Sequence, residues 1–443
     1  MEPNRRHKRK REPHAAPSRT TIASLDDDAL AEILLRLPSL ATLARAALAC
    51  ARWRSLATSR DFLRRFRALH SPPLLGCFVS FMSSVGAAFH RAQICSDRDL
   101  AAAGRGGDFF LTGLEDERQW RIRDCHHGLL LLTSVDDFAL LNPVSRRLIK
   151  ISSRRPIASY EFKNRFSFHC CLLPAYGGDD VQMASFRLVA LEYRSYNGQQ
   201  VCAHVYSSGT GEWRTHPWAP PSIEPPPPHW NRDESSYPSM HSAGRIYWKY
   251  QKGDVLLSLD TAPGGSMEFS HVALPPVPEL YRPQAPYVVG DSEGGACCLV
   301  CVVSDPPGGR KRTLQVWIRN EEARSWELQT KVNLSSMFAC SGLNRHKVHQ
   351  VCAVTMGVVL LSLDHGFECY RYAAFRLKNL YAALGARGKP KLPLEADFIS
   401  CRELAAYPYL LAWPPLLQQS PHRCRKIPSR DTPSLVNCSH ICV

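Results

Sequence analysis

The chain has 443 residues, of which 44% are hydrophobic and 21% charged; this is a globular composition and excludes a wholly disordered chain. The net charge is +15, but residues 1–70 alone hold 15 of the 55 basic and only seven of the 40 acidic residues. This uneven distribution argues against a basic nucleic-acid-binding face spread over the remainder of the chain.

The N-terminal sequence and the cysteines indicate the compartment. No apolar core follows the basic N-terminus, and no run of 18 apolar residues occurs, so neither a secretory signal nor a transmembrane helix is expected. We therefore expect the 17 cysteines to be reduced thiols in a protein of the nucleus, the cytoplasm or both.

Residues 1–21 lack hydrophobic periodicity and are expected to form a disordered arm. Its compact basic run is either a nuclear-import signal or a solvated tail, and the sequence leaves both alternatives open. The run consists of Arg5, Arg6, Lys8, Arg9, Lys10 and Arg11.

Residues 22–69 are expected to be helical. Ser24 is placed to cap a first helix, and three aspartates follow it in the first turn, where they complement the helix dipole. Leu30, Ile33, Leu34 and Leu37 then recur at the helical spacing, before Pro38 stops the helix.

Residues 70–75 are interpreted as a linker, residues 76–415 as an all-β domain and residues 416–443 as a loose tail. Within the β domain, short apolar runs alternate with Gly, Pro, Asp and Asn, which is typical of strands and turns. The longest helical pattern there is predicted over 372–384. Tryptophans recur in or beside strand-like runs, as at Trp213 and Trp326, and this loose repeat favours a β-propeller of about six to eight blades.

Motifs for catalysis or metal binding are weak. Gly290–Gly294 matches the G-x-S-x-G nucleophile elbow, but a strand-like run follows it where a helix is required, so a hairpin turn is expected. Cys298 and Cys301 lie in an apolar run and are interpreted as small hydrophobic residues. His126-His127 lacks a partner carboxylate in a readable motif and is interpreted as structural or loop-exposed.

The C-terminal tail holds zinc-ligand residue types at irregular spacing: His422, Cys424, Cys438, His440 and Cys442. Whether this tail binds metal or is disordered stays open. We predict no cofactor, no metal site and no catalytic residue.

The helical segment closely resembles an F-box in the order and spacing of its residues. The resemblance is carried by Leu25, Leu30, Glu32, Ile33, Leu34, Arg36, Leu37, Pro38, Leu43, Leu48, Ala49, Cys50, Arg52, Trp53, Arg54 and Phe62. It implies a three-helix fold that binds a Skp-family adaptor and, through it, a cullin. The predicted adaptor-binding residues are Leu25, Leu30, Ile33, Leu34, Leu37, Pro38, Leu43, Leu48 and Trp53.

The β region resembles the F-box-associated β domain of many plant F-box proteins. The segments that carry this resemblance are 125–132, 141–147, 211–214, 244–248, 257–260, 314–317, 407–409 and 413–415. The fold class expected is therefore an α+β multidomain protein, with a small three-helix F-box followed by a large, propeller-like all-β domain.

Together these resemblances imply the non-catalytic substrate receptor of a Skp–cullin–F-box ubiquitin ligase, whose β domain binds an unknown target protein. A nuclear, nucleic-acid-associated protein that uses the basic arm and the β domain is the alternative, and an enzyme is the third hypothesis. Nucleic acid is not the expected partner, and no membrane association is expected.

Overall fold

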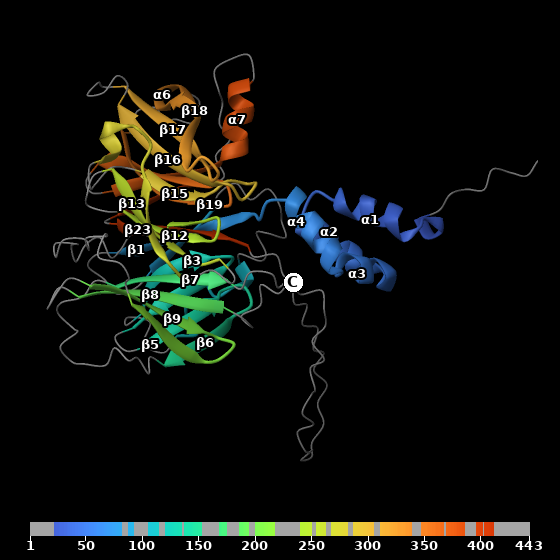
Figure 1. Cartoon of the computed structure of the whole chain (residues 1–443). Helices are drawn as coiled ribbons and strands as arrows, with labels where there is room; N and C mark the ends of the chain where they lie inside the picture. Colours follow the sequence, from blue (N-terminus) through green and yellow to red (C-terminus); the bar gives the residue numbers. More distant parts are fainter. Residues whose placement is uncertain are drawn as a thin grey trace, which may run out of the picture. The chain divides into compact units, whose positions relative to one another are not determined.

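A computed structural model divides the chain into two compact units, Met1–Leu69 and His70–Val443 (Figure 1). The residues that the structure describes are 22–81, 87–92, 105–114, 120–134, 137–152, 168–174, 186–194, 200–217, 240–249, 254–262, 267–281, 287–304, 311–338, 347–366, 369–385, 396–401 and 403–411.

The first unit is helical. A 3-10 turn (Ile22–Ser24) precedes α1 (Asp27–Leu35), α2 (Leu40–Ala49), α3 (Ala51–Ala57) and α4 (Arg60–Leu69). The resemblance implied three helices, and the structure has four because the backbone at Cys50 is extended and separates α2 from α3.

Side-chain caps fix the beginnings of the first two helices. Asp26, and not Ser24 as the sequence suggested, caps α1 by accepting a hydrogen bond of 2.7 Å from the Ala29 amide. Ser39 and Thr42 form a reciprocal capping box at the start of α2. Pro38 follows the end of α1, as predicted.

The second unit is a six-bladed β-propeller, in which five sheets have four antiparallel strands and one has three. The strands of the four-stranded blades are β3 (Arg121–His126), β4 (Leu129–Thr133), β5 (Asp137–Asn142) and β6 (Arg147–Ser152); β7 (Phe168–Pro174), β8 (Phe186–Arg194), β9 (Gln200–Ser207) and β10 (Glu212–Pro217); β11 (Met240–Ser242), β12 (Arg245–Lys249), β13 (Val255–Asp260) and β14 (Phe269–Ala273); β15 (Tyr287–Asp291), β16 (Cys297–Ser304), β17 (Arg312–Asn320) and β18 (Ser325–Asn333); and β19 (Lys347–Thr355), β20 (Val358–Gly366), β21 (Cys369–Arg376) and β22 (Ala396–Cys401).

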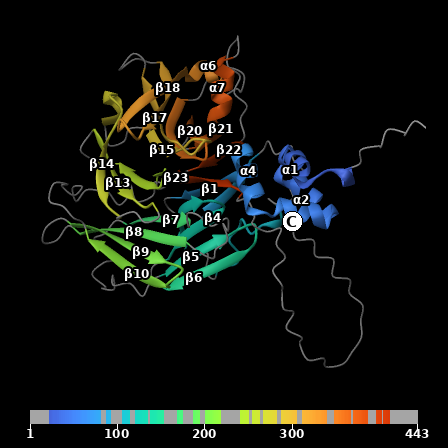
Figure 2. The same ribbon diagram turned by 45° about the vertical axis from the view of Figure 1, so that its right-hand side comes forward.

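The sixth blade joins strands from distant parts of the chain. Its order is β2 (Ala87–Arg91), β1 (Leu74–Phe81) and β23 (Glu403–Leu410), and Figure 2 shows β1 and β23 lying side by side. The antiparallel register pairs Phe78 with Tyr407. The last described strand therefore closes the ring onto the first.

Six hydrophobic clusters explain why the blades form a ring, because each cluster fills the space between two neighbouring blades. Successive side chains of one strand point to opposite neighbours. On β16, for example, Leu299 packs towards the third blade and Val300 towards the fifth. Strands buried on both faces are apolar almost throughout, which accounts for sequences such as CCLVCVV.

Two expectations on element bounds need correction. β1 begins at Leu74, inside the expected linker 70–75, because Leu74 and Leu75 are buried between blades. The helix predicted over 372–384 begins only at Leu377: β21 occupies the residues up to Arg376, and α7 spans Leu377–Gly385. The side chains from 372 to 377 are all buried, so their pattern does not distinguish a strand from a helix.

Two short helical segments complete the described elements, a 3-10 turn at Pro278–Tyr281 and α6 at Leu334–Met337. The segment Gly290–Gly294 lies in the hairpin between β15 and β16, as predicted. Within the described part of the chain, no helix is long and apolar enough to cross a membrane.

Candidate functional site

The nine predicted adaptor-binding residues differ in exposure. Leu30, Leu34 and Leu43 are almost completely buried and therefore belong to the core. Leu25, Leu37 and Trp53 are half-buried, whereas Ile33, Pro38 and Leu48 are exposed. Ile33 is 47% and Leu48 67% exposed, so these two side chains are available to a partner in the isolated chain.

Polar contacts hold α1 in place. Arg52 on α3 lies 2.7 Å from the carboxylate of Asp27 and also donates to the Leu25 carbonyl. Arg65 on α4 pairs with Glu32, which precedes Ile33. Polar contacts thus join α1, the helix that carries Ile33, to α3 and α4. The fold therefore determines where this exposed side chain lies.

Two further exposed apolar side chains of this unit, Ile22 and Leu69, are not among the predicted adaptor-binding residues. Ile22 begins the 3-10 turn, and Leu69 ends α4, where it continues the helical spacing of Phe62 and Phe66. The basic run Arg5–Arg11 and the histidines and cysteines of the C-terminal tail lie outside the described residues.

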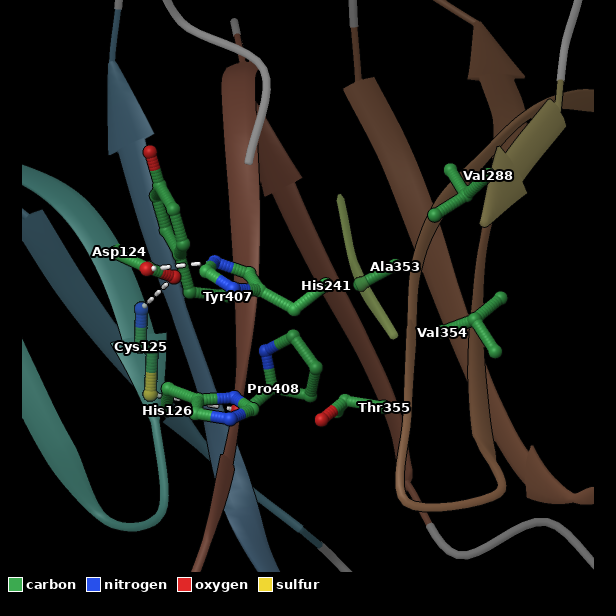
Figure 3. A pocket seen from close by; sticks show the side chains of 10 residues that line it. All are labelled: Asp124, Cys125, His126, His241, Val288, Ala353, Val354, Thr355, Tyr407 and Pro408. Carbon is green, nitrogen blue, oxygen red and sulfur yellow. Dashed lines mark hydrogen bonds and ion pairs between the residues drawn. The ribbon is translucent and has the colours of Figure 1, made fainter. Parts of the chain in front are cut away.

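A second candidate site lies at the centre of the propeller, where the innermost strands surround a cavity of about 30 Å³ (Figure 3). A cavity of this size accommodates about one or two water molecules. Its lining residues are Asp124, Cys125, His126, His241, Val288, Ala353, Val354, Thr355, Tyr407 and Pro408.

Asp124 connects three inner strands at this site. Its Oδ2 accepts from the Leu172 amide on β7 at 2.8 Å and lies 3.0 Å from Nε2 of His241 on β11. Its Oδ1 accepts from the Cys125 amide at 2.8 Å. Figure 3 shows His241 pointing across the centre to this carboxylate.

A second carboxylate extends these contacts to a fourth strand. Asp291 on β15 accepts from the Ser242 hydroxyl at 2.6 Å and from the Ala243 amide at 3.1 Å. Burial raises the pKa of Asp291, while these hydrogen bonds and the nearby His241 act in the opposite direction. We call the side chains of Asp124, His241, Ser242 and Asp291 the inner polar chain.

His126 lies against the inner polar chain through its ring. The rings of His126 and His241 stack with centroids 5.1 Å apart, and His127 meets His126 edge-on at 4.3 Å. Burial, followed by the charges of His127 and His241, holds the pKa of His126 well below its usual value. His126 is therefore neutral at physiological pH.

The polar side chains at this centre bond to one another and to the backbone of neighbouring strands. Burial and the neighbouring Asp124 raise the pKa of the Cys125 thiol, which disfavours a nucleophilic thiolate, and Cys125 Sγ lies 3.4 Å from the Pro408 carbonyl oxygen. The carboxylate beside the histidine pair bonds His241, a residue that sequence reasoning did not single out. Among the described residues, no group of three or more His, Cys, Asp or Glu side chains is arranged to hold a metal ion.

Comparisons with known proteins identify both units. The F-box domain model matches residues 22–65, and the family model described as F-box protein AT5G49610-like, β-propeller, matches residues 121–362. A search of curated protein sequences found no significant match.

Solved structures resemble the chain only distantly. A putative 6-phosphogluconolactonase from Bacteroides uniformis has 8% identity and a TM-score of 0.33, with 75% of this chain and 98% of that chain covered. The Nup133 β-propeller domain of Vanderwaltozyma polyspora has 9% identity and a TM-score of 0.28, with 65% and 92% covered. TM-scores this low support no argument about function.

Proposed function

Since the chain belongs to the F-box proteins with an AT5G49610-like β-propeller, we propose that it is the substrate-recognition subunit of a Skp–cullin–F-box ubiquitin ligase. The helical unit binds the Skp-family adaptor, which binds the cullin, and the propeller binds a target protein for ubiquitination.

The observation that carries this proposal is the F-box match over residues 22–65, since an F-box implies binding to a Skp adaptor in general. Exposed Ile33 and Leu48 support it, because apolar side chains held outside the core are typical of a docking surface. The core residues Leu30, Leu34 and Leu43 support the same surface from within.

The proposed role of the receptor in the reaction is to position the target protein. F-box proteins are typically non-catalytic, and holding a target lysine near a ubiquitin-charged carrier raises the effective concentration of the reacting groups. The chemical step then belongs to other subunits, and this chain determines which protein is presented.

The test is co-purification of a Skp-family adaptor with the full chain. We expect the wild-type chain to retain the adaptor and the double variant Ile33→Asp, Leu48→Asp to lose it, with affinity reduced at least about tenfold. Both positions are exposed in the free chain, so the variant is expected to fold, and circular dichroism checks this.

Leu69→Asp is the matched control, because Leu69 is 63% exposed in the same unit but is not among the predicted adaptor residues. It is expected to keep the adaptor. If the folded wild-type chain binds no adaptor, the ligase proposal is wrong.

We further propose that the basic run Arg5–Arg11 directs nuclear import, since it places six basic residues within a compact segment. Replacing its six basic residues by Ser in a fluorescently tagged full chain is expected to shift the protein from nucleus to cytoplasm. An unchanged distribution would mean that the run is a solvated tail.

A further inference from the structure

The chain enters the propeller through a short segment that is neither helix nor strand. Leu69 ends α4 and Leu74 begins β1. We call Ser71-Pro72-Pro73, which leads into β1, the entry segment, and its middle residue is buried. A proline fixes its own φ and restricts the residue before it, so two successive prolines stiffen this segment.

Both proline carbonyls of the entry segment accept hydrogen bonds from distant parts of the chain. Arg376 Nη2, from the fifth blade, donates to the Pro72 carbonyl oxygen at 2.6 Å. The Leu411 amide, which follows β23, donates to the Pro73 carbonyl oxygen at 2.9 Å. The carbonyl is the only hydrogen-bonding group of a proline, and both are used here. The entry segment is therefore anchored at two successive residues.

Arg376 is itself held in place. It is 5% exposed and ends β21, where it lies opposite Val358 on β20. The next residue, Leu377, donates from its amide to the Gly357 carbonyl at 2.9 Å. A guanidinium shielded from water makes a strong hydrogen bond, because the local dielectric constant is low. Arg376 thus presents a fixed, charged donor to the entry segment.

The anchored Pro72 carbonyl shortens the connection between the two units. Only His70 and Ser71 lie between the end of α4 and Pro72, and two residues span at most about 7 Å. The Ser71 hydroxyl is also contacted, since Nζ of Lys378 lies 3.5 Å from it. The propeller thus takes hold of the chain two residues after α4 ends.

We infer that Arg376 is a positioning residue for ubiquitin transfer, an inference that rests on the proposed function. In this transfer a lysine amine attacks the thioester of the ubiquitin-charged carrier. The new C–N bond forms as the C–S bond breaks, the carrier thiol leaves and the amine loses a proton. A short tether to the adaptor-binding unit restricts which lysines reach the thioester, whereas a long flexible tether admits many.

The lysines of the propeller are the probe, because they report reach without a known target. Lys150 on β6, Lys311 before β17 and Lys331 on β18 are all exposed. A ligase is reconstituted from the full chain, a Skp-family adaptor, a cullin complex and the charged carrier. Mass spectrometry then gives the fraction of each lysine that bears ubiquitin. In the wild type, we expect the most and the least modified of the three to differ at least about fivefold.

Two variants loosen the connection in different ways. Six residues, alternately Gly and Ser, inserted between His70 and Ser71 lengthen it by up to about 20 Å and keep the Arg376 contact. This insertion is expected to reduce the difference among the three lysines to less than about twofold. Arg376→Met removes the donor to Pro72. It is expected to shift the distribution the same way but less, because the second proline keeps its bond.

Arg245→Met is the matched control. Arg245 is half-buried and donates to Asp260 and Ser270 within the third blade, away from the entry segment. It is expected to leave the distribution of ubiquitin unchanged. Melting curves check that each variant is folded, and Arg376→Gln replaces Arg376→Met if the latter does not fold.

The inference would be overturned by a wild-type chain that binds the adaptor but shows equal modification, or none, at the three lysines. An unchanged distribution in the insertion variant or in the folded Arg376 variant would overturn it as well. All variants leave residues 22–69 intact and are expected to retain the Skp adaptor. Absence of adaptor binding by the wild type would instead contradict the ligase proposal, so the two failures are distinguishable.

Discussion

At the residue scale, the inner polar chain concentrates buried charge where the blades meet. Asp124 joins β3 to β7 and β11 through one carboxylate that is only 4% exposed. A buried carboxylate with several hydrogen bonds stabilises the fold through its partners, because its removal leaves their polar groups unsatisfied.

We expect Asp124→Ala to destabilise the propeller by about 3 kcal/mol, because it removes the carboxylate that accepts from the buried Leu172 amide and lies against the His241 ring. Urea unfolding followed by tryptophan fluorescence measures this loss. Asp254→Ala, at an exposed position, is the control and should change stability by less than about 0.5 kcal/mol. Equal effects of the two variants would contradict a structural role for the inner polar chain.

His126 predicts a pH dependence. Its folded-state pKa is depressed by burial and by His127 and His241, so folding competes with its protonation. Its contribution to stability is complete above the unfolded-state pKa of about 6.5 and falls as the pH drops below that value.

The measurement is the melting temperature from pH about 7.5 to about 5.5. His126→Gln is expected to flatten the decline on the acid side relative to the wild type, whatever its stability at neutral pH. Parallel curves for the two proteins would show that His126 does not titrate in this way.

Part of the propeller core could be predicted from the sequence. The interpretation of Cys298 and Cys301 as small hydrophobic residues was correct, because both are completely buried between blades. The partnership of Asp124 with His241 could not be predicted, because nothing in the sequence shows which strands become neighbours at the centre of a ring.

At the scale of elements, the inner strands approach one another so closely that one position has no room for a side chain. A Cβ at Gly290 on β15 would collide with the backbone of Val354 on β19. Gly294, at the other end of the same G-x-S-x-G segment, has its nearest such neighbour, the Ser292 hydroxyl, at 3.9 Å. The motif thus combines a packing glycine with a turn glycine, in a hairpin between two strands.

We expect Gly290→Ala to destabilise the propeller by about 3 kcal/mol through overpacking. Gly294→Ala is expected to change stability by less than about 0.5 kcal/mol. Thermal and urea unfolding of the two variants measure the difference. Similar stabilities would mean that β15 and β19 separate without cost.

Element type was more predictable than the role of each face. The strand β16, for example, was predicted from the strand-like run that follows Gly290–Gly294. On α1, the helical spacing selected both exposed Ile33 and buried Leu34, since periodicity identifies an apolar side without showing what covers it.

At the scale of the whole molecule, closure of the ring depends on β23. This strand pairs with β1, and the hydroxyls of Tyr407 and Tyr409 donate to the carbonyls of Ile122 and Gly128 in the neighbouring blade. The sequence indicated six to eight blades, and the structure has six. The pairing of the closing strand was not predictable, because its partner lies at the opposite end of the domain.

A chain truncated after Cys401 therefore loses the strand that pairs with β1 and exposes two blade faces. We expect its propeller to be digested rapidly in limited proteolysis, while the separate helical unit still co-purifies with the adaptor. A chain truncated after Leu411 keeps every described strand and serves as the control. Equal protease resistance of the two chains would contradict closure by β23.

Because β23 closes the ring, the helical unit and the propeller become complete at different times during synthesis. A ribosome adds roughly 5–20 residues per second, so α1–α4 emerge on the order of half a minute before β23. During that interval the nascent chain presents the helical unit, to which we assign adaptor binding, while β1 of the propeller still lacks its partner strand β23. Emergence of β23, and not the appearance of the helical unit, is then the event that completes the propeller proposed to bind the target.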